Sequence, residues 1–153
     1  MITNHIESIK IHHILDTDPD TSWMGKYSNT KEKWAIDRQV VNRRIGRNEY
    51  RYFIPANNDN RMEDYKRMEA LNRGDWYFIG IVAKAKVVIN GIIQHLTSGG
   101  LWGIESDYAN TDKKYLDQIE SEQLTELSET LECIGFAREE ILKAQEGYET
   151  VKE

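Results

Sequence analysis

Cysteine is almost absent from this chain, and its scarcity excludes several kinds of small protein. The 153 residues include a single cysteine, Cys133, so no intrachain disulfide framework can hold the fold together. One cysteine also excludes a zinc ribbon. A lone thiol is consistent with a reducing compartment, and a chain of this length can bury roughly 70% of its unfolded surface in a hydrophobic core.

Long apolar runs, internal repeats, low-complexity segments and flexible linkers are missing as well. The first residues hold no apolar stretch of the length that a signal peptide needs, and no segment approaches the roughly 20 apolar residues of a membrane span. We therefore expect a cytoplasmic protein without a membrane partner, folded as a single domain over residues 1–153. No motif with a tightly defined chemistry occurs, so we expect no cofactor and favour a binding protein over an enzyme.

Charge is distributed unevenly along the chain. The net charge is −6. Residues 26–73 nevertheless hold 12 Lys and Arg against 7 Asp and Glu, whereas residues 105–153 hold 14 Asp and Glu against 5 Lys and Arg. Such asymmetry is typical of a surface that faces nucleic acid, of a surface that faces a protein, or of two parts of one fold that attract each other.

The most apolar stretch of the chain, residues 75–107, predicts strands. Its β-branched and apolar residues are interrupted only by Asn90-Gly91 and by residues 98–100, which read Ser-Gly-Gly. Asn-Gly fits a type I′ turn, because both central residues of that turn take positive φ. We expect a three-stranded antiparallel meander over about 76–105, with residues 98–100 as its second hairpin turn. A phosphate-binding loop would need a helix directly after it, and a strand pattern follows here instead.

The rest of the chain supplies one further strand and several helices. Residues 5–15 alternate in polarity, with His13 among apolar residues on one side, which predicts a strand with one buried face. Residues 61–73, 111–134 and 137–147 have apolar residues at helical spacing. The fold class is therefore predicted to be α+β, with an antiparallel sheet made of the meander and the N-terminal strand and with helices packed on one face.

The predicted helix over residues 111–134 has an acidic outer face about five turns long. The carboxylates assigned to this face are Asp117, Glu120, Glu122, Glu126 and Glu129. Spaced carboxylates can steer a protein to a basic partner or imitate a phosphate backbone. The basic segment 26–73 counts against a DNA mimic, which would be acidic throughout, so we take this face as the candidate site for a protein partner.

A metal-dependent, hydrolase-like site is a first alternative. Carboxylates at the ends of two predicted strands can hold a divalent cation that activates water. The candidate ligands are Asp16, Asp18, Asp20, Glu105 and Asp107. The spacing of residues 16–20 resembles the start of a calcium loop, but Thr21 stands where that loop needs glycine and Tyr27 where it needs glutamate.

A nucleic-acid-binding accessory protein is a second alternative. Arginine interleaved with aromatic residues over 43–53 is a composition that binds phosphates and stacks bases. The candidates are Arg43, Arg44, Arg47, Arg51, Tyr50 and Tyr52. An edge strand whose arginine side chains cover ring faces has the same composition, so nucleic acid is the less favoured partner.

Self-association of the chain is a further expectation. The aromatic residues expected outside the core are Trp23, Trp34, Tyr50 and Tyr108. These are more than a small monomer usually exposes.

The string SGGLWGIESD, residues 98–107, resembles a motif of small proteins found in phages and other mobile elements. It is preceded by NRGDWYFIGIVAKAKV and followed by Tyr115-Leu116, and the resemblance covers roughly residues 60–135, with residues 16–28 as a further match. The resemblance carries over no catalytic residue. It implies an accessory protein of the bacterial host cytoplasm, in company where inhibitors of host defence are common. We therefore expect a non-enzymatic protein that docks on a host or phage protein through its acidic helix face.

Overall fold

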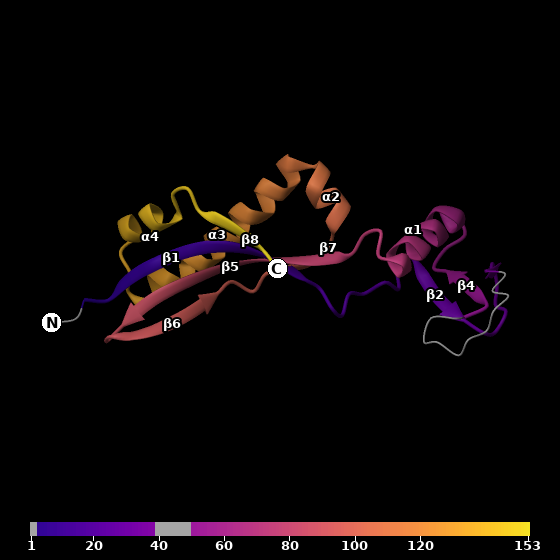
Figure 1. The fold of residues 1–153 in the computed structure, drawn as a ribbon, viewed down its shortest axis with the longest axis horizontal. Helices are drawn as coiled ribbons and strands as arrows, with labels where there is room; N and C mark the ends of the chain where they lie inside the picture. Colours follow the sequence, from indigo (N-terminus) through magenta and orange to yellow (C-terminus); the bar gives the residue numbers. More distant parts are fainter. Residues whose placement is uncertain (1–2, 39–49) are drawn as a thin grey trace. The chain divides into compact units, whose positions relative to one another are not determined.

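The structure is a computed structural model, and it describes residues 3–38 and 50–153. The chain divides into two compact units: a larger unit, formed by Met1–Thr17 and Phe78–Glu153, and a smaller unit, Asp18–Tyr77. Strands and helices occur in both units, so the predicted α+β class is confirmed (Figure 1). The expectation of a single domain over residues 1–153 stays a prediction, because it depends on how the two units are joined.

The larger unit is built on a five-stranded sheet. Its two long strands, β1 (His5–Leu15) and β5 (Phe78–Ile89), pair in antiparallel fashion at its centre. β8 (Glu149–Lys152) runs parallel to β1 on its outer side. β6 (Ile92–Thr97) and β7 (Leu101–Glu105) both pair with β5. The N-terminal strand and the strands of residues 76–105 therefore form one sheet, as expected.

The predicted meander is wrong in its second turn. β6 pairs with residues 84–89 of β5 and β7 pairs with residues 78–81, both in antiparallel fashion, so the two strands lie end to end along the edge of β5 opposite β1. Ser98 shows why the chain does not reverse between them. Its N–H donates to the carbonyl oxygen of Ala83 at 2.9 Å, and its hydroxyl accepts the N–H of Ala83 at 2.9 Å. Residues 98–100 therefore continue along β5 instead of forming a hairpin.

The first turn forms as expected. Asn90 and Gly91 have φ values of 52° and 77°, and Ile89 lies opposite Ile92 across the turn. Because both central residues of a type I′ turn need positive φ, Asn-Gly determines where β5 ends and β6 begins.

Three helices follow β7: α2 (Ser106–Thr111), α3 (Lys113–Ile134) and α4 (Arg138–Gln145). The single helix predicted over 111–134 begins at Lys113, because the Asp112 side chain caps it by accepting the N–H of Tyr115 at 3.0 Å. Gly135, with φ of 112°, ends α3 in the left-handed conformation, which glycine adopts without a steric penalty. Among the described residues, no helix combines the length and the apolar character needed to cross a membrane.

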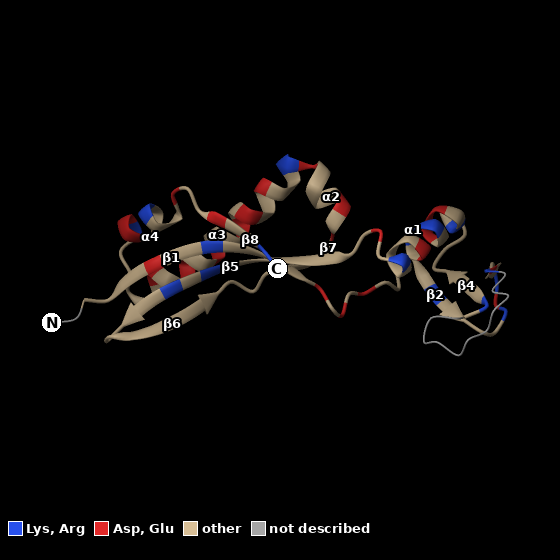
Figure 2. Ribbon diagram, in the orientation of Figure 1, with Lys and Arg blue, Asp and Glu red and all other residues tan. Residues whose placement is uncertain are grey.

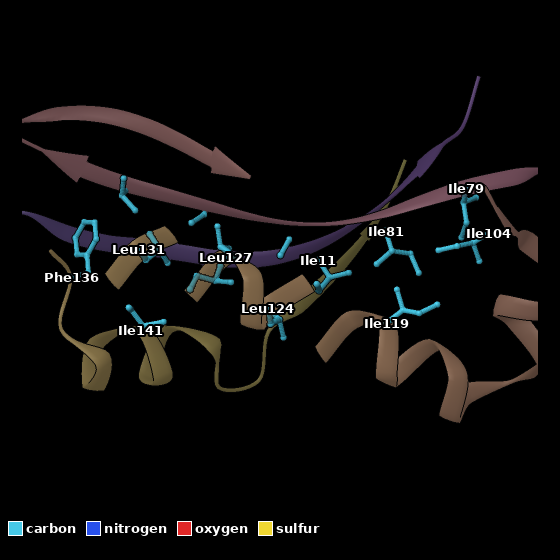
Figure 3. Packing of buried hydrophobic residues seen from close by; sticks show 14 of the residues in the cluster. Ile11, Ile79, Ile81, Ile104, Ile119, Leu124, Leu127, Leu131, Phe136 and Ile141 are labelled. Carbon is cyan, nitrogen blue, oxygen red and sulfur yellow. The ribbon is translucent and has the colours of Figure 1, made fainter. Parts of the chain in front are cut away.

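The helices α3 and α4 pack on one face of the sheet, and the core lies between the two layers (Figure 3). The core cluster includes Ile11 of β1, Ile81 of β5, Leu127 and Leu131 of α3, and Ile141 of α4, and each of these side chains is at most 1% exposed. Burial of one such side chain contributes about 1.5 to 3 kcal/mol. The side chains that alternate with these on β1 and β5 point to the other face of the sheet.

The smaller unit contains a short antiparallel sheet in the order β2-β4-β3, formed by β2 (Gly25–Ser28), β3 (Ile36–Asp37) and β4 (Tyr52–Pro55). One helix, α1 (Arg61–Arg73), follows with the bounds that the sequence predicted. Phe53 is fully buried in this unit, and its ring stacks on that of Tyr65 at a centroid distance of 5.6 Å.

Candidate functional site

Four of the five carboxylates predicted to bind a partner are exposed on α3. These are Asp117, Glu122, Glu126 and Glu129, and we call them the acidic ridge. Glu122 and Glu129 are seven residues apart and share one side of the helix, whereas Asp117 and Glu126 are nine residues apart and lie on opposite flanks of it. The helix has no Lys or Arg from Tyr115 to its end. In the part of the chain that the structure describes, no ion pair includes a residue of the ridge. The ridge therefore presents negative charge that its own helix does not neutralise.

The expectation that Glu120 lies on this exposed face is wrong, because Glu120 is buried with 5% of its surface exposed. It lies four residues after Leu116, four before Leu124 and seven before Leu127, and residues at these separations share one helix face. The spacing in the sequence thus already places Glu120 in the middle of the apolar face. A carboxylate at the centre of a buried face needs polar partners in the core.

Glu120 has two such partners, which come from other elements. His13 Nε2 on β1 lies 2.9 Å from Glu120 Oε2, and the Tyr148 hydroxyl donates to Glu120 Oε1 at 2.7 Å. Burial acts to raise the pKa of Glu120. The hydrogen bonds from His13 and Tyr148, the charge interaction with His13 and a hydrogen bond from Thr150 together outweigh burial and hold this pKa below its ordinary value. Burial and the bond to Glu120 raise the pKa of Tyr148 to about 12.

The group of His13, Glu120 and Tyr148 links three elements of the larger unit. His13 belongs to β1, Glu120 to α3, and Tyr148 directly precedes β8. Histidine and glutamate are the usual general acids and bases, but the side chains of His13 and Glu120 are only 8% and 6% exposed. Their placement inside the core makes this group a structural link and keeps it from a substrate in solution.

Two side chains of α3 hold the glycine segment between β6 and β7. The N–H of Gly99 donates to Glu126 Oε1 at 2.8 Å, and the N–H of Gly100 donates to Gln123 Oε1 at 3.0 Å. The Ser98 hydroxyl donates to the same Gln123 oxygen at 2.6 Å. The successive amides that could cradle an external anion therefore bind oxygens of the protein itself. Glu126 has this internal contact in addition to its place on the ridge.

The residues predicted as metal ligands in the larger unit do not form a metal centre. No group of three or more His, Cys, Asp or Glu in the described part of the chain is arranged to hold a metal ion. The Asp16 carboxylate accepts the N–H of Gly103 at 3.0 Å, and Asp107 accepts the N–H of Tyr108 at 3.0 Å. Glu105 is the last residue of β7. Asp16 thus binds the backbone of β7, and Asp107 binds the N–H of the residue that follows it.

The other two predicted ligands, Asp18 and Asp20, belong to the smaller unit. Asp20 accepts hydrogen bonds from the hydroxyl and the N–H of Ser22 at 2.6 and 2.9 Å, and these bonds lower the pKa of its carboxyl group. Both aspartates are exposed. The acidic loop therefore has the internal bonding of a solvated turn.

Half of the predicted nucleic-acid-binding residues can be placed. Three of the six, Arg43, Arg44 and Arg47, lie outside the described residues. The guanidinium of Arg51 lies over the ring of Tyr52 at 5.2 Å and pairs with Asp37 at 3.2 Å. The ring of Tyr50 stacks on that of Tyr27 at 6.2 Å. The described part of this segment thus places arginine over an aromatic ring within one small sheet, and nucleic-acid binding by the whole segment stays a prediction.

The aromatic residues expected outside the core are exposed. Trp23, Trp34, Tyr50 and Tyr108 are each more than a third exposed. Self-association through them stays a prediction.

Comparison of the sequence with protein-family models, with curated proteins and with solved structures gives no match. The resemblance of residues 98–107 to proteins of phages and mobile elements also stays a prediction. Function is therefore inferred from the residues and their placement.

Proposed function

We propose that the chain is a non-enzymatic binding protein that docks on a basic surface of a protein partner through the outer face of α3. The observation that carries this proposal is the acidic ridge of Asp117, Glu122, Glu126 and Glu129 on a helix without Lys or Arg beyond its first two residues. Figure 2 shows acidic residues along this helix after a basic start. A surface of one charge sign raises the rate of encounter with an oppositely charged partner.

Exposed apolar side chains accompany the ridge and favour a protein partner. Tyr115 lies near the start of α3, Ile134 at its end and Leu142 on the neighbouring α4, and each is more than 40% exposed. Affinity in protein interfaces comes chiefly from apolar and aromatic anchors, while rim charges contribute rate and specificity. A ridge of carboxylates with apolar residues at its ends supplies both kinds of contact.

The setting of this proposal is a bacterial host cytoplasm, with a phage or mobile element as the source of the chain and a host or phage protein as its target. In this setting, the consequence of binding that we propose is inhibition of a host-defence protein. The resemblance of residues 98–107 and their neighbours supports the setting, and the acidic ridge supports the mode of binding.

The proposal is tested by capturing partner proteins from a bacterial lysate with the immobilised chain. Two variants are compared, which differ in where two negative charges are removed. The ridge variant is Glu122→Gln/Glu129→Gln, and the control is Asp59→Asn/Glu63→Gln in the smaller unit, where both residues are exposed. Each pair removes two negative charges. Glu126 is left unchanged because it also holds Gly99. We expect the ridge variant to retain at least about fivefold less of the specific partner than the control, at moderate as well as low salt.

Circular dichroism of both variants confirms that they remain folded. Equal capture by the two variants would contradict docking through α3. Failure of the unaltered chain to retain a specific protein at either salt concentration would contradict the proposed function as a whole.

A further inference from the structure

The face of the five-stranded sheet opposite α3 and α4 gathers basic side chains. These side chains occupy the positions of β1, β5 and β6 that alternate with the core positions. Together with Ser8 and Ala85 they line one pocket of about 300 Å³. We call the basic residues of this pocket the lysine face: Lys10, His12, Lys84, Lys86 and His95.

Neighbouring strands bring like charges of the lysine face together. Lys10 lies directly opposite Lys84 across the central pair β1 and β5. Lys86 lies opposite His95 across β5 and β6, and a histidine carries a positive charge only when it is protonated. Like charges in directly opposed positions destabilise a sheet. Figure 2 shows the resulting basic positions on the two long strands. This cluster of lysines lies on the sheet face away from the helices. The repulsion between the lysines would be relieved by a bound anion.

Carboxylates at the margin of the lysine face compensate it only in part. Glu149 pairs with Lys10 at 3.3 Å, Glu7 with Lys86 at 3.2 Å, and Glu153 Oε1 lies 2.7 Å from His12 Nδ1. All three carboxylates are more than a third exposed. Ion pairs this exposed are weak, so an anion with several charges can replace these carboxylates. Among the described residues Lys84, in the middle of the face, makes no ion pair.

An exposed tryptophan lies on the same side of the sheet. Gly80 alternates with the core residues Ile79 and Ile81, so a side chain at Gly80 would point to the lysine face. A Cβ built at Gly80 would lie only 2.1 Å from Cε3 of Trp102, which shows that the indole ring covers the backbone there. Trp102 is 46% exposed. The face therefore combines cations with an exposed aromatic ring, which lies at Gly80, four positions along β5 from Lys84.

We propose that this sheet face binds single-stranded nucleic acid, with the lysine face holding the phosphates and Trp102 stacking on a base. Folds that bind single strands without a sequence code combine a basic groove along the backbone with aromatic side chains on which bases stack. The Glu153 carboxylate lies beside His12, at the position that we assign to a phosphate oxygen of the bound strand. The surface is separate from the acidic ridge, so the two proposals succeed or fail independently.

Fluorescence anisotropy measures the affinity for a labelled single-stranded oligonucleotide as the salt concentration is varied. An oligonucleotide of about 12 nucleotides is suitable, because single-strand-binding folds cover sites of this length. Each lysine that contacts a phosphate contributes about −0.7 to the slope of log K against log salt. Lys10→Gln/Lys84→Gln is therefore expected to make the slope shallower by about 1.4. Lys113→Gln/Lys114→Gln at the start of α3 removes the same charge elsewhere and is expected to leave the slope unchanged.

Two further variants separate specific contacts from a general effect of charge. Trp102→Leu leaves every charge in place and is expected to weaken binding by about tenfold, because one stacked base is lost. Glu153→Gln removes the internal carboxylate and is expected to tighten binding by about twofold. Circular dichroism establishes that each variant is folded.

Three results would overturn the proposal. The first is no binding of single-stranded DNA or RNA by the unaltered chain at low ionic strength. The second is equal salt slopes for the two lysine variants. The third is binding of duplex DNA, or of inorganic phosphate and free nucleotides, in place of the single strand.

Discussion

Glu120 permits a direct test of the core of the larger unit, because its side chain binds the buried ring of His13 and the partly buried hydroxyl of Tyr148 at once. Glu120→Ala leaves the ring of His13 and the hydroxyl of Tyr148 without the carboxylate that each now contacts at 2.9 and 2.7 Å. Removal of one partner from a buried pair typically costs about 3 to 5 kcal/mol, because the remaining group stays buried and uncompensated. Since whole domains are stable by only about 5 to 15 kcal/mol, we expect this substitution to remove a large part of the stability.

Urea unfolding followed by far-ultraviolet circular dichroism measures the loss. With a slope of about 2 kcal/mol per molar urea, a loss of 3 to 5 kcal/mol lowers the midpoint by about 1.5 to 2.5 M. Glu129→Ala on the exposed side of the same helix is the matched control, and its expected effect is within about 0.5 kcal/mol. Hydrogen exchange of peptides from α3 locates the loss in the larger unit.

The pH dependence of stability follows from the lowered pKa of Glu120. Because the pKa of this carboxyl group in the folded chain lies below its unfolded value of about 4.3, the contribution of its charge is fully present above about pH 5. It is lost as the pH falls through the folded pKa. The stability difference between the unaltered chain and Glu120→Gln should therefore shrink on acidification. A difference that is constant from about pH 6 to pH 3, or a cost of Glu120→Ala below about 1 kcal/mol, would refute this account of the core.

Two other substitutions test contacts elsewhere in the chain. Gly80→Val forces the Trp102 ring away, because a Cβ at this position would lie 2.1 Å from the ring. We expect a stability loss of about 1 to 3 kcal/mol and stronger quenching of tryptophan fluorescence by iodide. Unchanged quenching would contradict the packing of Trp102 on Gly80. Arg38→Lys removes a buried guanidinium that contacts both carboxylate oxygens of Glu69, at 2.6 and 3.3 Å, and lies 4.3 Å above the ring of Tyr27. It should lower the stability of the smaller unit by about 2 kcal/mol. Arg51→Lys, at an exposed pair, should have little effect, and hydrogen exchange of β2 and β4 distinguishes the two variants.

Local signals in the sequence were enough to predict several elements of the fold. Asn90-Gly91 determines a turn by the φ values that its two residues adopt, and Gly135 ends α3 for the same kind of reason. Polar and apolar residues alternate over residues 5–15, and apolar residues recur at helical spacing over residues 61–73. Both patterns can be recognised from neighbouring residues alone, so both elements could be predicted. The α+β class follows from these elements together.

The course of residues 98–100 could not be predicted in the same way. Ser-Gly-Gly between two apolar segments has the composition of a hairpin turn. What decides its path is the pairing of Ser98 with Ala83, and the contacts of residues 98–100 with Gln123 and Glu126. These partners lie 15 to 27 residues away in the chain. The contacts with Gln123 and Glu126 exist only once α3 has packed on the sheet, so no short window of sequence contains them.

Glu120 and the lysine face were missed for different reasons. The spacing of Glu120 from Leu116 and Leu124 indicates burial. The charge of glutamate indicates exposure instead, because glutamate is rarely buried without a partner, and the sequence does not show the partners of Glu120. The alternation that places Lys84 and Lys86 on one side of β5 was also visible. The pairing of Lys10 with Lys84 was not, because it depends on the register between two strands that lie about 70 residues apart in the sequence.

The two charged surfaces lie on opposite sides of one packed core, and this arrangement determines how they influence each other. A helix packed on a sheet separates their outer faces by more than about 10 Å. The Debye length is about 8 Å at physiological ionic strength and about 30 Å at 0.01 M salt. We therefore expect the acidic ridge to weaken the proposed anion binding on the lysine face at low salt and to have little influence on it at physiological salt. At physiological salt the two proposed binding events, each with a partner of opposite charge, should consequently not reduce each other's affinity.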